Sequence, residues 1–389
     1  MPILNRAAEM QGEIAAWRRN LHAMPELQFD LYKTAAFVEE KLRSFGCDQV
    51  TPGLAKTGIV AIIKGARGEG PVIGLRADMD ALPIHEATGQ PWASQTPGAM
   101  HACGHDGHTA MLLGAARYLA ETRNFAGSVA LIFQPAEEGG GGGGVMVREG
   151  MMERFGITKV FGMHNMPGLP VGRFATRSGP IMASTAEFTL TIKGRGGHAA
   201  MPHMTVDPIV IAAQIVTALQ TIASRNADPV ESVVVTVTKF HAGDAYNVIP
   251  ASAELAGTVR TLKKELAALA EQRLRALVSG IANACGAEAE IAYDANYPVT
   301  FNHEAETAFS VDVARAIAGD AAVNGATPPV MGGEDFSYML EARPGSFIFI
   351  GNGPTAGLHN AAYDFNDEII PHGVSYWVKL AETALPPQA

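Results

Sequence analysis

Five continuous apolar segments constrain the fold of this chain more than any other feature. They consist mainly of Ile, Val, Leu, Phe, Ala and Gly, and they occupy residues 58–63, 72–75, 129–133, 160–163 and 347–350. Such runs suit strands buried on both faces, as in a largely parallel sheet covered by helices. Segments with helical periodicity separate several of them, for example 108–122 and 304–318. The sequence therefore predicts an α/β fold, with a mostly parallel mixed sheet flanked by helices.

A different strand pattern predicts a second, smaller domain. In residues 188–193, Phe, Leu and Ile alternate with Thr, Thr and Lys, so that one face of the strand meets water. Residues 232–240 and 253–260 are further strand candidates. We therefore expect an α+β domain at 184–287, inserted into a discontinuous first domain formed by 1–183 and 288–389.

Two helices are predicted within the insertion. One begins after Asp207 as its N-cap and has Pro208 in its first turn; the other runs from about 262 to 284 and stops at Gly286. Their expected apolar stripes are Ile209, Ala213, Val216 and Leu219 in the first helix, and Leu266, Leu269, Leu277 and Ile281 in the second.

Composition and charge exclude several classes of protein. Hydrophobic residues make up 47% of the 389 residues, which excludes a disordered chain. The net charge is -10 and no Lys/Arg run exceeds a pair, which argues against a nucleic-acid partner. The three cysteines are too few and odd in number for a disulfide framework. Because we find no signal peptide and no uninterrupted apolar stretch of membrane-spanning length, we expect a cytoplasmic protein without a membrane partner.

Metal-competent side chains follow the predicted strands. In open α/β sheets, ligands bind beyond the carboxyl ends of the strands. The residues found there, or in the segment before the helix at 108–122, are Asp78, Asp80, Cys103, His105, Glu137, Glu138, His164 and His359. Thiolate, imidazole and carboxylate donors together suit Zn²⁺ and similar divalent cations. Adjacent glutamates on a regular strand cannot both face one point, so we assign one to a metal and the other to a neighbouring water.

Other interpretations of these residues exist. A single cysteine is more often a small core residue, and Cys47 and Cys285 keep that interpretation. Three histidines within 101–108 favour a site for Cys103. The glutamate pair could also begin a helix. The glycine run 139–144 lacks the Lys-Ser/Thr of a phosphate-binding loop, so it more simply lets the backbone approach a site closely.

Five ordered motifs give the chain a family resemblance that spans nearly its whole length. They are RADMDALP (76–83), MHACGHDGH (100–108), QPAEE (134–138), GRGGHAAMP (194–202) and GGEDF (332–336). The chain resembles the aminoacylase, hippurate hydrolase and auxin-conjugate hydrolase group of dinuclear metallo-amidohydrolases.

The resemblance implies roles for individual residues. It implies two divalent ions (Zn, Mn, Co or Ni) held by Cys103, His105, Glu138, His164 and His359, with Glu137 as the general base. It also implies that the insertion is a lid that mediates a homodimer, with His198 reaching the substrate carbonyl in the partner's active site. Asn247 and Arg260 are implied to bind substrate, although an ordinary turn and a strand-edge charge explain them about as well. Distant relatives carry His-x-Asp where this chain has Asp78-Met79-Asp80, so Asp80 is expected to orient a ligand.

The resulting hypothesis is metal-dependent hydrolysis of N-acyl or N-aroyl amino acids to a carboxylic acid and a free amino acid. A metal-activated water attacks, Glu137 carries its proton to the leaving amine, and Arg260 pairs with the substrate carboxylate. Two alternatives remain open on the residues alone. Cys103 could be the nucleophile of a thiol acyl-hydrolase or transferase with His105 or His101 as base, or the chain could be a non-catalytic dimeric binding protein on the same fold.

Overall fold

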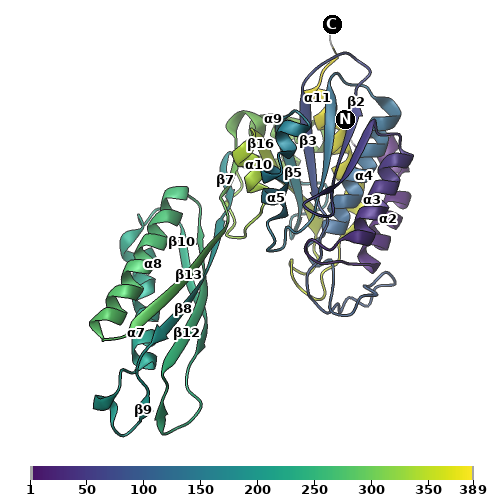
Figure 1. Cartoon of the computed structure of the whole chain (residues 1–389). Helices are drawn as coiled ribbons and strands as arrows, with labels where there is room; N and C mark the ends of the chain where they lie inside the picture. Colours follow the sequence, from purple (N-terminus) through teal and green to yellow (C-terminus); the bar gives the residue numbers. More distant parts are fainter. Residues whose placement is uncertain (1–2, 388–389) are drawn as a thin grey trace. The chain divides into compact units, whose positions relative to one another are not determined.

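The computed structural model describes residues 3–387, which form two compact units. Unit 1 comprises the described residues up to Ile181, together with Phe301–Pro328 and the segment from Asp335 onwards. Unit 2 comprises Met182–Thr300 and Pro329–Glu334. Each unit has its own layered arrangement of helices and strands (Figure 1).

The sheet of unit 1 has eight strands in the order β1-β2-β4-β3-β5-β16-β6-β15. Their bounds are β1 Gln49–Leu54, β2 Gly58–Lys64, β3 Val72–Asp78, β4 Ser128–Gln134, β5 Ile157–Pro167, β6 Phe174–Ala175, β15 Val323–Asn324 and β16 Gly345–Gly353. The central pairs β4–β3, β3–β5 and β5–β16 are parallel, whereas β1–β2, β2–β4 and β16–β6 are antiparallel. All five apolar runs became strands of this mixed sheet, as predicted.

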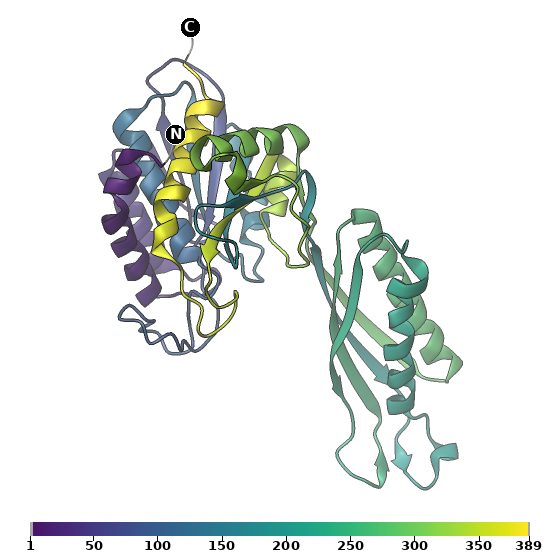
Figure 2. The same ribbon diagram turned by 180° about the vertical axis from the view of Figure 1, so that it is seen from behind.

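Helices cover the sheet of unit 1. They are α1 Asn5–Glu9, α2 Gln11–Ala23, α3 Tyr32–Ser44, α4 His105–Thr122, α5 Gly142–Arg148, α6 Met151–Arg154, α9 Glu304–Ala318, α10 Ser337–Ala342 and α11 Ile370–Ala384. Helices α2, α3 and α4 lie side by side, and α11 packs against α4 and α9 (Figure 2). Phe161 and Ile348 belong to the core between the sheet and these helices. Phe347 points to the other face of the sheet, where its ring packs against Phe336, the residue before α10, and lies next to Gly162.

Unit 2 is a four-stranded antiparallel sheet with two helices. The sheet order is β10-β12-β8-β13. The elements are β8 Ser184–Lys193, β9 Gly197–His198, α7 Pro208–Thr221, β10 Val233–His241, β11 Val248–Ile249, β12 Ser252–Thr261, α8 Lys264–Ala284 and β13 Glu288–Tyr297. The separate strands β7 Gly179–Met182 and β14 Thr300–Asn302 pair with each other. Phe188, Leu190 and Ile192 of β8 are buried against α7 and α8, which agrees with the alternation seen in the sequence.

Three details of unit 2 differ from the sequence-based expectations. The buried stripe of α8 was predicted wrongly: Leu269, Leu277 and Ile281 are only partly buried, and the buried residues are Leu266, Ala270, Leu274, Val278 and Ala282. The unit extends beyond residue 287, because β13 adds to the sheet next to β8 and the segment Pro329–Glu334 returns to it. The buried face of α7 is also different: Ile211, Ala212, Ile215 and Leu219 are buried, whereas Ile209 and Ala213 are exposed. Because α7 is apolar on several sides, its periodicity could not decide which side faces the sheet. Asp207 does cap the helix, accepting a hydrogen bond from the Ile209 backbone.

Candidate metal centre

Five side chains predicted as metal ligands come together in unit 1. Two groups of three have donor atoms that all lie within 4.8 Å of one another: Cys103, His105 and His164 form one, and Cys103, Glu138 and His359 form the other. The two groups share the Cys103 sulfur. Segments more than 250 residues apart in the sequence thus contribute to one cluster, as the strand-end rule predicts.

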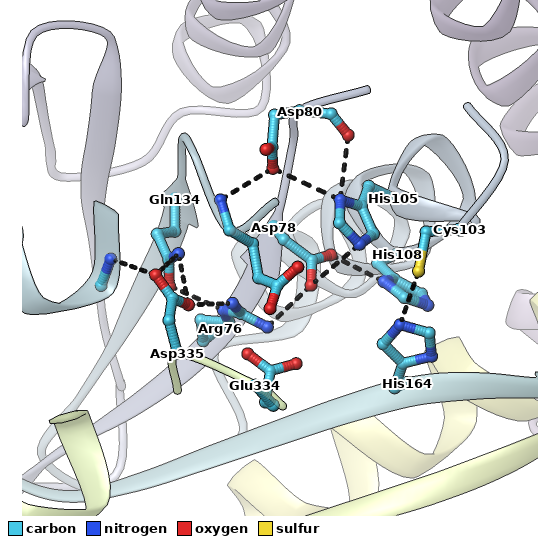
Figure 3. A network of polar contacts seen from close by, with 12 residues as sticks. Arg76, Asp78, Asp80, Cys103, His105, His108, Gln134, His164, Glu334 and Asp335 are labelled. Atoms are coloured by element: carbon cyan, nitrogen blue, oxygen red, sulfur yellow. Dashed lines mark hydrogen bonds and ion pairs between the residues drawn. The ribbon is translucent and has the colours of Figure 1, made fainter. Parts of the chain in front are cut away.

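The first group is buried. Cys103 is 7% exposed, His105 is fully buried and His164 is 6% exposed. The Cys103 Sγ lies 3.3 Å from the His164 Nε2. Figure 3 shows these two side chains facing each other. His105 begins α4, while His164 lies within β5 rather than after it, in register with Phe349 of β16. A sulfur and two imidazole nitrogens in a dry setting are a donor set that Zn²⁺ and related cations accept.

The second group lies nearer the surface. The His359 Nε2 is 3.2 Å from the Glu138 Oε1, and the side chain of His359 is 53% exposed. His359 adopts a positive φ of 60°, a conformation that few residues other than glycine adopt. Its backbone N–H donates to the carbonyl of Ala102, at 2.8 Å. That hydrogen bond fastens the loop carrying His359 to the residue that precedes Cys103.

Glu137 and Glu138 lie on a turn after β4, not on a strand. Ala136 has a φ of 54°, and α5 begins only at Gly142, so the pair does not start a helix. Because of the turn, carboxylate oxygens of both glutamates lie within 4.8 Å of a His105 nitrogen and of each other. The argument that neighbouring glutamates diverge applies to a regular strand, and this turn lets both face His105. Glu137, 7% exposed, therefore lies beside the ligand cluster.

Asp80 fixes this turn and the ring of His105. Its two carboxylate oxygens accept the backbone N–H groups of Glu137, at 3.0 Å, and Glu138, at 2.9 Å. The Asp80 carbonyl lies 2.9 Å from the His105 Nδ1 (Figure 3). A carbonyl can only accept, so Nδ1 carries the proton and Nε2 keeps its lone pair for a ligand. These contacts are the ones expected of a residue that orients ligands.

The same logic fixes His164 and excludes His108 as a ligand. His164 Nδ1 lies 2.6 Å from the carbonyl of Asn165, so its Nε2 is left to face Cys103. His108 lies within 4.8 Å of His105 and Asp78, a third possible ligand group. Its Nε2, however, accepts the backbone N–H of Asn165 at 2.9 Å, and its Nδ1 is 2.7 Å from Asp78. Both ring nitrogens of His108 are therefore engaged, and we assign it no metal.

Electrostatics favour a cation at the cluster. Burial by itself would lower the pKa of His105, but Asp78, Asp80 and Glu138 outweigh it and raise that pKa to about 10. Burial, followed by the repulsion of His108, lowers the pKa of His164 well below its usual value, which keeps that ring neutral. The carboxylates around His105 thus create a negative potential that favours positive charge at the cluster, which is either a proton on His105 or a bound cation in place of that proton.

Two buried atoms test whether the cluster fits a metal. Among the described residues, His105 Nε2 and Glu138 Oε1 have no hydrogen-bond partner, although they lie 4.0 Å apart. Glu138 Oε1 is also 3.2 Å from the His359 Nε2, but without hydrogen-bond geometry. Buried polar atoms are rarely left unpaired, because the loss of water costs about 1–3 kcal/mol each. Buried lone pairs left without hydrogen bonds in this cluster fit bound cations.

The candidate substrate-binding residues in unit 2 do not form one cluster. His198 and Asn247 are both exposed and neighbouring: β9 pairs with β11, and the Ala199 N–H donates to the Asn247 carbonyl. Arg260 is paired with Thr185 near the far end of β12. Eight residues separate it from Ser252, the first residue of β12, which corresponds to roughly 27 Å of strand. The structure thus brings His198 close to Asn247 but not to Arg260.

A buried ionic network beside the cluster was missed at the sequence level. Arg76 donates to Asp78 at 2.7 Å, to Gln134 at 2.9 Å and to Asp335 at 2.9 Å (Figure 3). Asp335 also accepts the backbone N–H of Gly143, at 2.8 Å. All four side chains are 0–1% exposed. The network joins the ends of β3 and β4 and the start of α5. Charged residues within motifs were the available signal, but their pairing could not be read from spacing.

Known proteins resemble this chain over nearly its full length. The model of peptidase family M20/M25/M40 matches residues 74–383. The hippurate hydrolase of Campylobacter jejuni is 41% identical over 381 residues, covering 98% of this chain and 99% of the relative. The N-acetyl-L-cysteine deacetylase of Bacillus subtilis is 42% identical, covering 93% and 85%.

A solved structure gives the same result. The YXEP protein of Bacillus subtilis, described as a dinuclear metal-binding peptidase of the M20 family, matches with a TM-score of 0.84 and 35% identity. The alignment covers 98% of this chain and all of that one. The family suggested by the five motifs is thereby confirmed. This chain belongs to peptidase family M20/M25/M40.

Proposed function

We propose that this protein is a metal-dependent amidohydrolase that cleaves N-acyl or N-aroyl amino acids into a carboxylic acid and a free amino acid. The observation that carries the proposal is the pair of three-donor groups that share Cys103, with Glu137 alongside. The relatives named as a hippurate hydrolase and an N-acetyl-L-cysteine deacetylase support this substrate class.

Two divalent cations would be held by the five ligands. Cys103, His105 and His164 would hold one, and Cys103, Glu138 and His359 the other, with the thiolate common to both. Zn, Mn, Co and Ni all accept such mixed donors, and availability decides among them. When bound, the cations supply Lewis acidity that polarises the amide carbonyl and makes water a stronger acid.

The protein's own groups carry out the proton transfers. Glu137 is held by its backbone N–H on Asp80 and lies beside the ligands without completing either group of three. Its carboxylate accepts a proton from the attacking water and donates it to the nitrogen of the leaving amine. One residue thus acts first as base and then as acid, a role typically worth about 10²–10⁴-fold in rate.

Substrate recognition is proposed for unit 2. The His198 imidazole would donate to the developing oxyanion, and Arg260 would pair with the substrate carboxylate. Asn247, next to His198, would contribute a second polar contact. Burial lowers the pKa of Arg260, but a guanidinium remains charged near neutral pH. Because Arg260 lies roughly 27 Å along β12 from the other two, all three cannot contact one small substrate within a single chain. We therefore propose that Arg260 serves the site of its own chain, whereas His198 and Asn247 serve the site of the partner.

The replacement Glu137→Gln tests the central assignment. It preserves the size and backbone hydrogen bond of the residue but cannot accept a proton, so we expect kcat to fall at least about 10³-fold. The metal content, measured by elemental analysis, should stay unchanged. Glu39→Gln, at an exposed ion pair with Arg43, is the control and should keep full activity on hippurate. Wild-type turnover by Glu137→Gln would rule out this base.

The alternative of a thiol enzyme is not favoured. Burial raises the pKa of the Cys103 thiol well above its usual value, and Glu138 and Glu137 raise it further. A nucleophilic cysteine requires the opposite, a lowered pKa that maintains the thiolate. Bound cations would reverse this effect and deprotonate Cys103 as a ligand. The alternative of a non-catalytic binding protein leaves the position of Glu137 unexplained.

We also propose that the protein forms a homodimer through unit 2. Strand β10 is an edge of the sheet, and edge strands are templates for pairing. Val234 and Phe240 of β10, and Ile209 and Val210 of the adjacent α7, are 38–54% exposed. The helical segment Pro208–Asn226 is strongly apolar, yet only about a third of its most apolar stretch is buried. A second copy of the chain would cover this apolar surface.

A mixing experiment tests whether His198 acts in the partner's active site. His198→Ala alone should lower kcat by about 10²–10³-fold. When Glu137→Gln and His198→Ala chains are co-refolded, a mixed dimer contains one site with both residues intact, if His198 is supplied by the partner. We then expect about one site in four to be active, whereas no recovery would contradict the assignment.

We place the enzyme in the cytoplasm, as its three free cysteines suggest.

A further inference from the structure

Asn165 lies between two of the proposed ligands and contacts the segments that carry both. It follows His164 in β5, is fully buried, and uses its backbone and its side chain in different directions. Sequence patterns gave it no role, because an asparagine within an apolar strand has no motif of its own. Every partner described below belongs to unit 1.

The backbone of Asn165 holds two histidines. Its carbonyl accepts from His164 Nδ1 at 2.6 Å, which leaves the Nε2 of that ring toward Cys103. Its N–H donates to His108 Nε2 at 2.9 Å. His108 in turn carries its proton on Nδ1 and donates to Asp78. These bonds involve main-chain atoms of Asn165, so they persist when its side chain is replaced.

The side chain of Asn165 holds the cysteine loop. Its Nδ2 donates to the carbonyl of Cys103 at 2.6 Å and also lies 3.1 Å from His108 Nε2. Its Oδ1 accepts the hydroxyl of Tyr363 at 2.8 Å. A Cβ at Gly104 would come within 2.3 Å of the amide nitrogen and 2.5 Å of the tyrosine oxygen. The loop can therefore approach this amide only because Gly104 has no side chain.

We infer that Asn165 is a positioning residue that sets Cys103 against His164 through its side-chain amide. The inference rests on the proposed metal centre and deepens it. The Cys103 carbonyl and the His164 ring are both fixed by this one residue, so the 3.3 Å between Sγ and Nε2 depends on it.

The amide is required chemically, not only sterically. The Cys103 carbonyl presents a lone pair to Nδ2, and only a donor can satisfy it. In Asn165→Asp an oxygen of the same size replaces that donor. The oxygen repels the carbonyl and pushes the Cys103 loop away, while the backbone bonds to His164 and His108 remain. Partners of this kind typically change metal affinity by about 10–100-fold.

Cobalt titration of the metal-free full-length protein tests the inference. Co²⁺ bound to a thiolate gives a charge-transfer absorption, so the signal reports ligation by Cys103 independently of turnover. Asn302→Asp is the matched control: Asn302 is also fully buried, and its side chain bonds to Thr176, Arg177 and Phe347, away from the ligands. We expect Asn165→Asp to bind cobalt at the thiolate about 10–100-fold more weakly than wild type. Asn302→Asp should bind within about twofold of wild type, even if both variants unfold at a lower temperature.

The outcomes separate the inference about Asn165 from the proposed metal centre on which it rests. Equal thiolate-linked affinity in Asn165→Asp and wild type overturns the inference, as does an equal loss in Asn302→Asp. Absence of the charge-transfer band in the wild-type protein instead overturns the proposed metal centre. Should Asn165→Asp not fold, Tyr363→Phe takes its place, because it removes the hydroxyl that orients the same amide. Weaker cobalt binding in Tyr363→Phe then supports the inference, and unchanged binding overturns it.

Discussion

The ligand cluster of unit 1 and the β9–β11 end of unit 2 hold their polar residues in opposite ways. In the cluster, Cys103, His105 and His164 are at most 7% exposed. The imidazoles of His105 and His164 each donate an Nδ1 proton to a backbone carbonyl. In unit 2, His198 and Asn247 are exposed, and His198 Nδ1 accepts only the nearby Ala200 N–H, at 3.1 Å. The cluster is therefore organised in advance, whereas the residues of unit 2 are positioned by their backbone alone.

This difference matches what each region is proposed to do. A metal ligand must hold its geometry within a fraction of an ångström, so partners that fix its orientation are needed. A residue that meets a substrate only during turnover can remain solvated until then. Substitutions in the cluster should therefore alter metal binding, and substitutions in unit 2 should alter turnover while leaving the metals in place.

The largest expected effect comes from Cys103→Ala. Loss of the shared sulfur removes one ligand from both groups of three, so we expect bound metal to fall and activity to drop at least about 10³-fold, since several kcal/mol of Lewis-acid assistance are lost. Elemental analysis measures the bound metal, and a hippurate assay measures the activity. Cys285→Ala, at an exposed cysteine, is the control. Retained activity after Cys103→Ala or after chelation would show that the cluster is not a catalytic metal site.

Leu274→Ala tests whether the two cores are independent. Leu274 of α8 is fully buried in the core of unit 2, and within residues 3–387 the buried residues of that core are not shared with the main core of unit 1. We expect the free energy of unfolding of unit 2 to fall by about 3.5 kcal/mol. Circular dichroism should detect an earlier transition. Tryptophan fluorescence should not shift, because Trp17, Trp92 and Trp377 all lie in unit 1. A parallel shift of both signals would contradict independence.

A somewhat smaller effect is expected from His22, a buried residue of unit 1. Burial alone would lower its pKa, but attraction and hydrogen bonding to Asp106, and a hydrogen bond to Glu86, raise it to about 9 from 6.5. The raised pKa means that its stabilisation is complete below about pH 6.5 and is lost as the pH rises through about 9. The loss amounts to at most about 3 kcal/mol.

Urea unfolding followed by tryptophan fluorescence checks this prediction at pH 6 and pH 10. The wild-type free energy of unfolding should decrease between these values by about 3 kcal/mol more than that of His22→Gln, which cannot titrate there. Arg18, which is buried close to Asp106 and has its guanidinium 5.1 Å from the ring of Trp92, makes the fluorescence sensitive to this region. Equal pH dependence in the two proteins would place the titration elsewhere.

The sequence predicted the sheet of unit 1 well because burial on both faces leaves an unmistakable apolar run. The strand pattern predicted that metal-competent side chains gather at one edge of the sheet, and the family resemblance singled out the five residues that cluster there. The sequence-based prediction was wrong where the pattern of apolar residues in a segment was ambiguous. Helix α7 is apolar on several sides, so the wrong stripe was expected to be buried. Strand β13 alternates Ala with charged residues, as in Glu288-Ala289-Glu290, so its extension of unit 2 was missed.

Sequence reasoning also missed the polar residues that support the ligands. Asn165 and Arg76 each have a partner far away in the chain: Cys103 lies 62 positions from Asn165, and Asp335 lies 259 positions from Arg76. No local periodicity encodes such pairs. The turn at Glu137 and Glu138 depends on the positive φ of Ala136, which alanine rarely adopts. The sequence of this segment therefore suggested that the strand continues or that a helix begins, rather than a turn.

The carboxylate of Asp80 accepts two consecutive backbone N–H groups, so this one side chain couples Glu137, the proposed proton carrier, to Glu138. Any displacement of this backbone segment moves Glu137 and Glu138 together. The proposed acid–base group therefore cannot shift while the proposed metal ligand beside it keeps its position. We accordingly expect Asp80→Ala, which removes both hydrogen bonds, to lower the turnover rate and the bound metal content together.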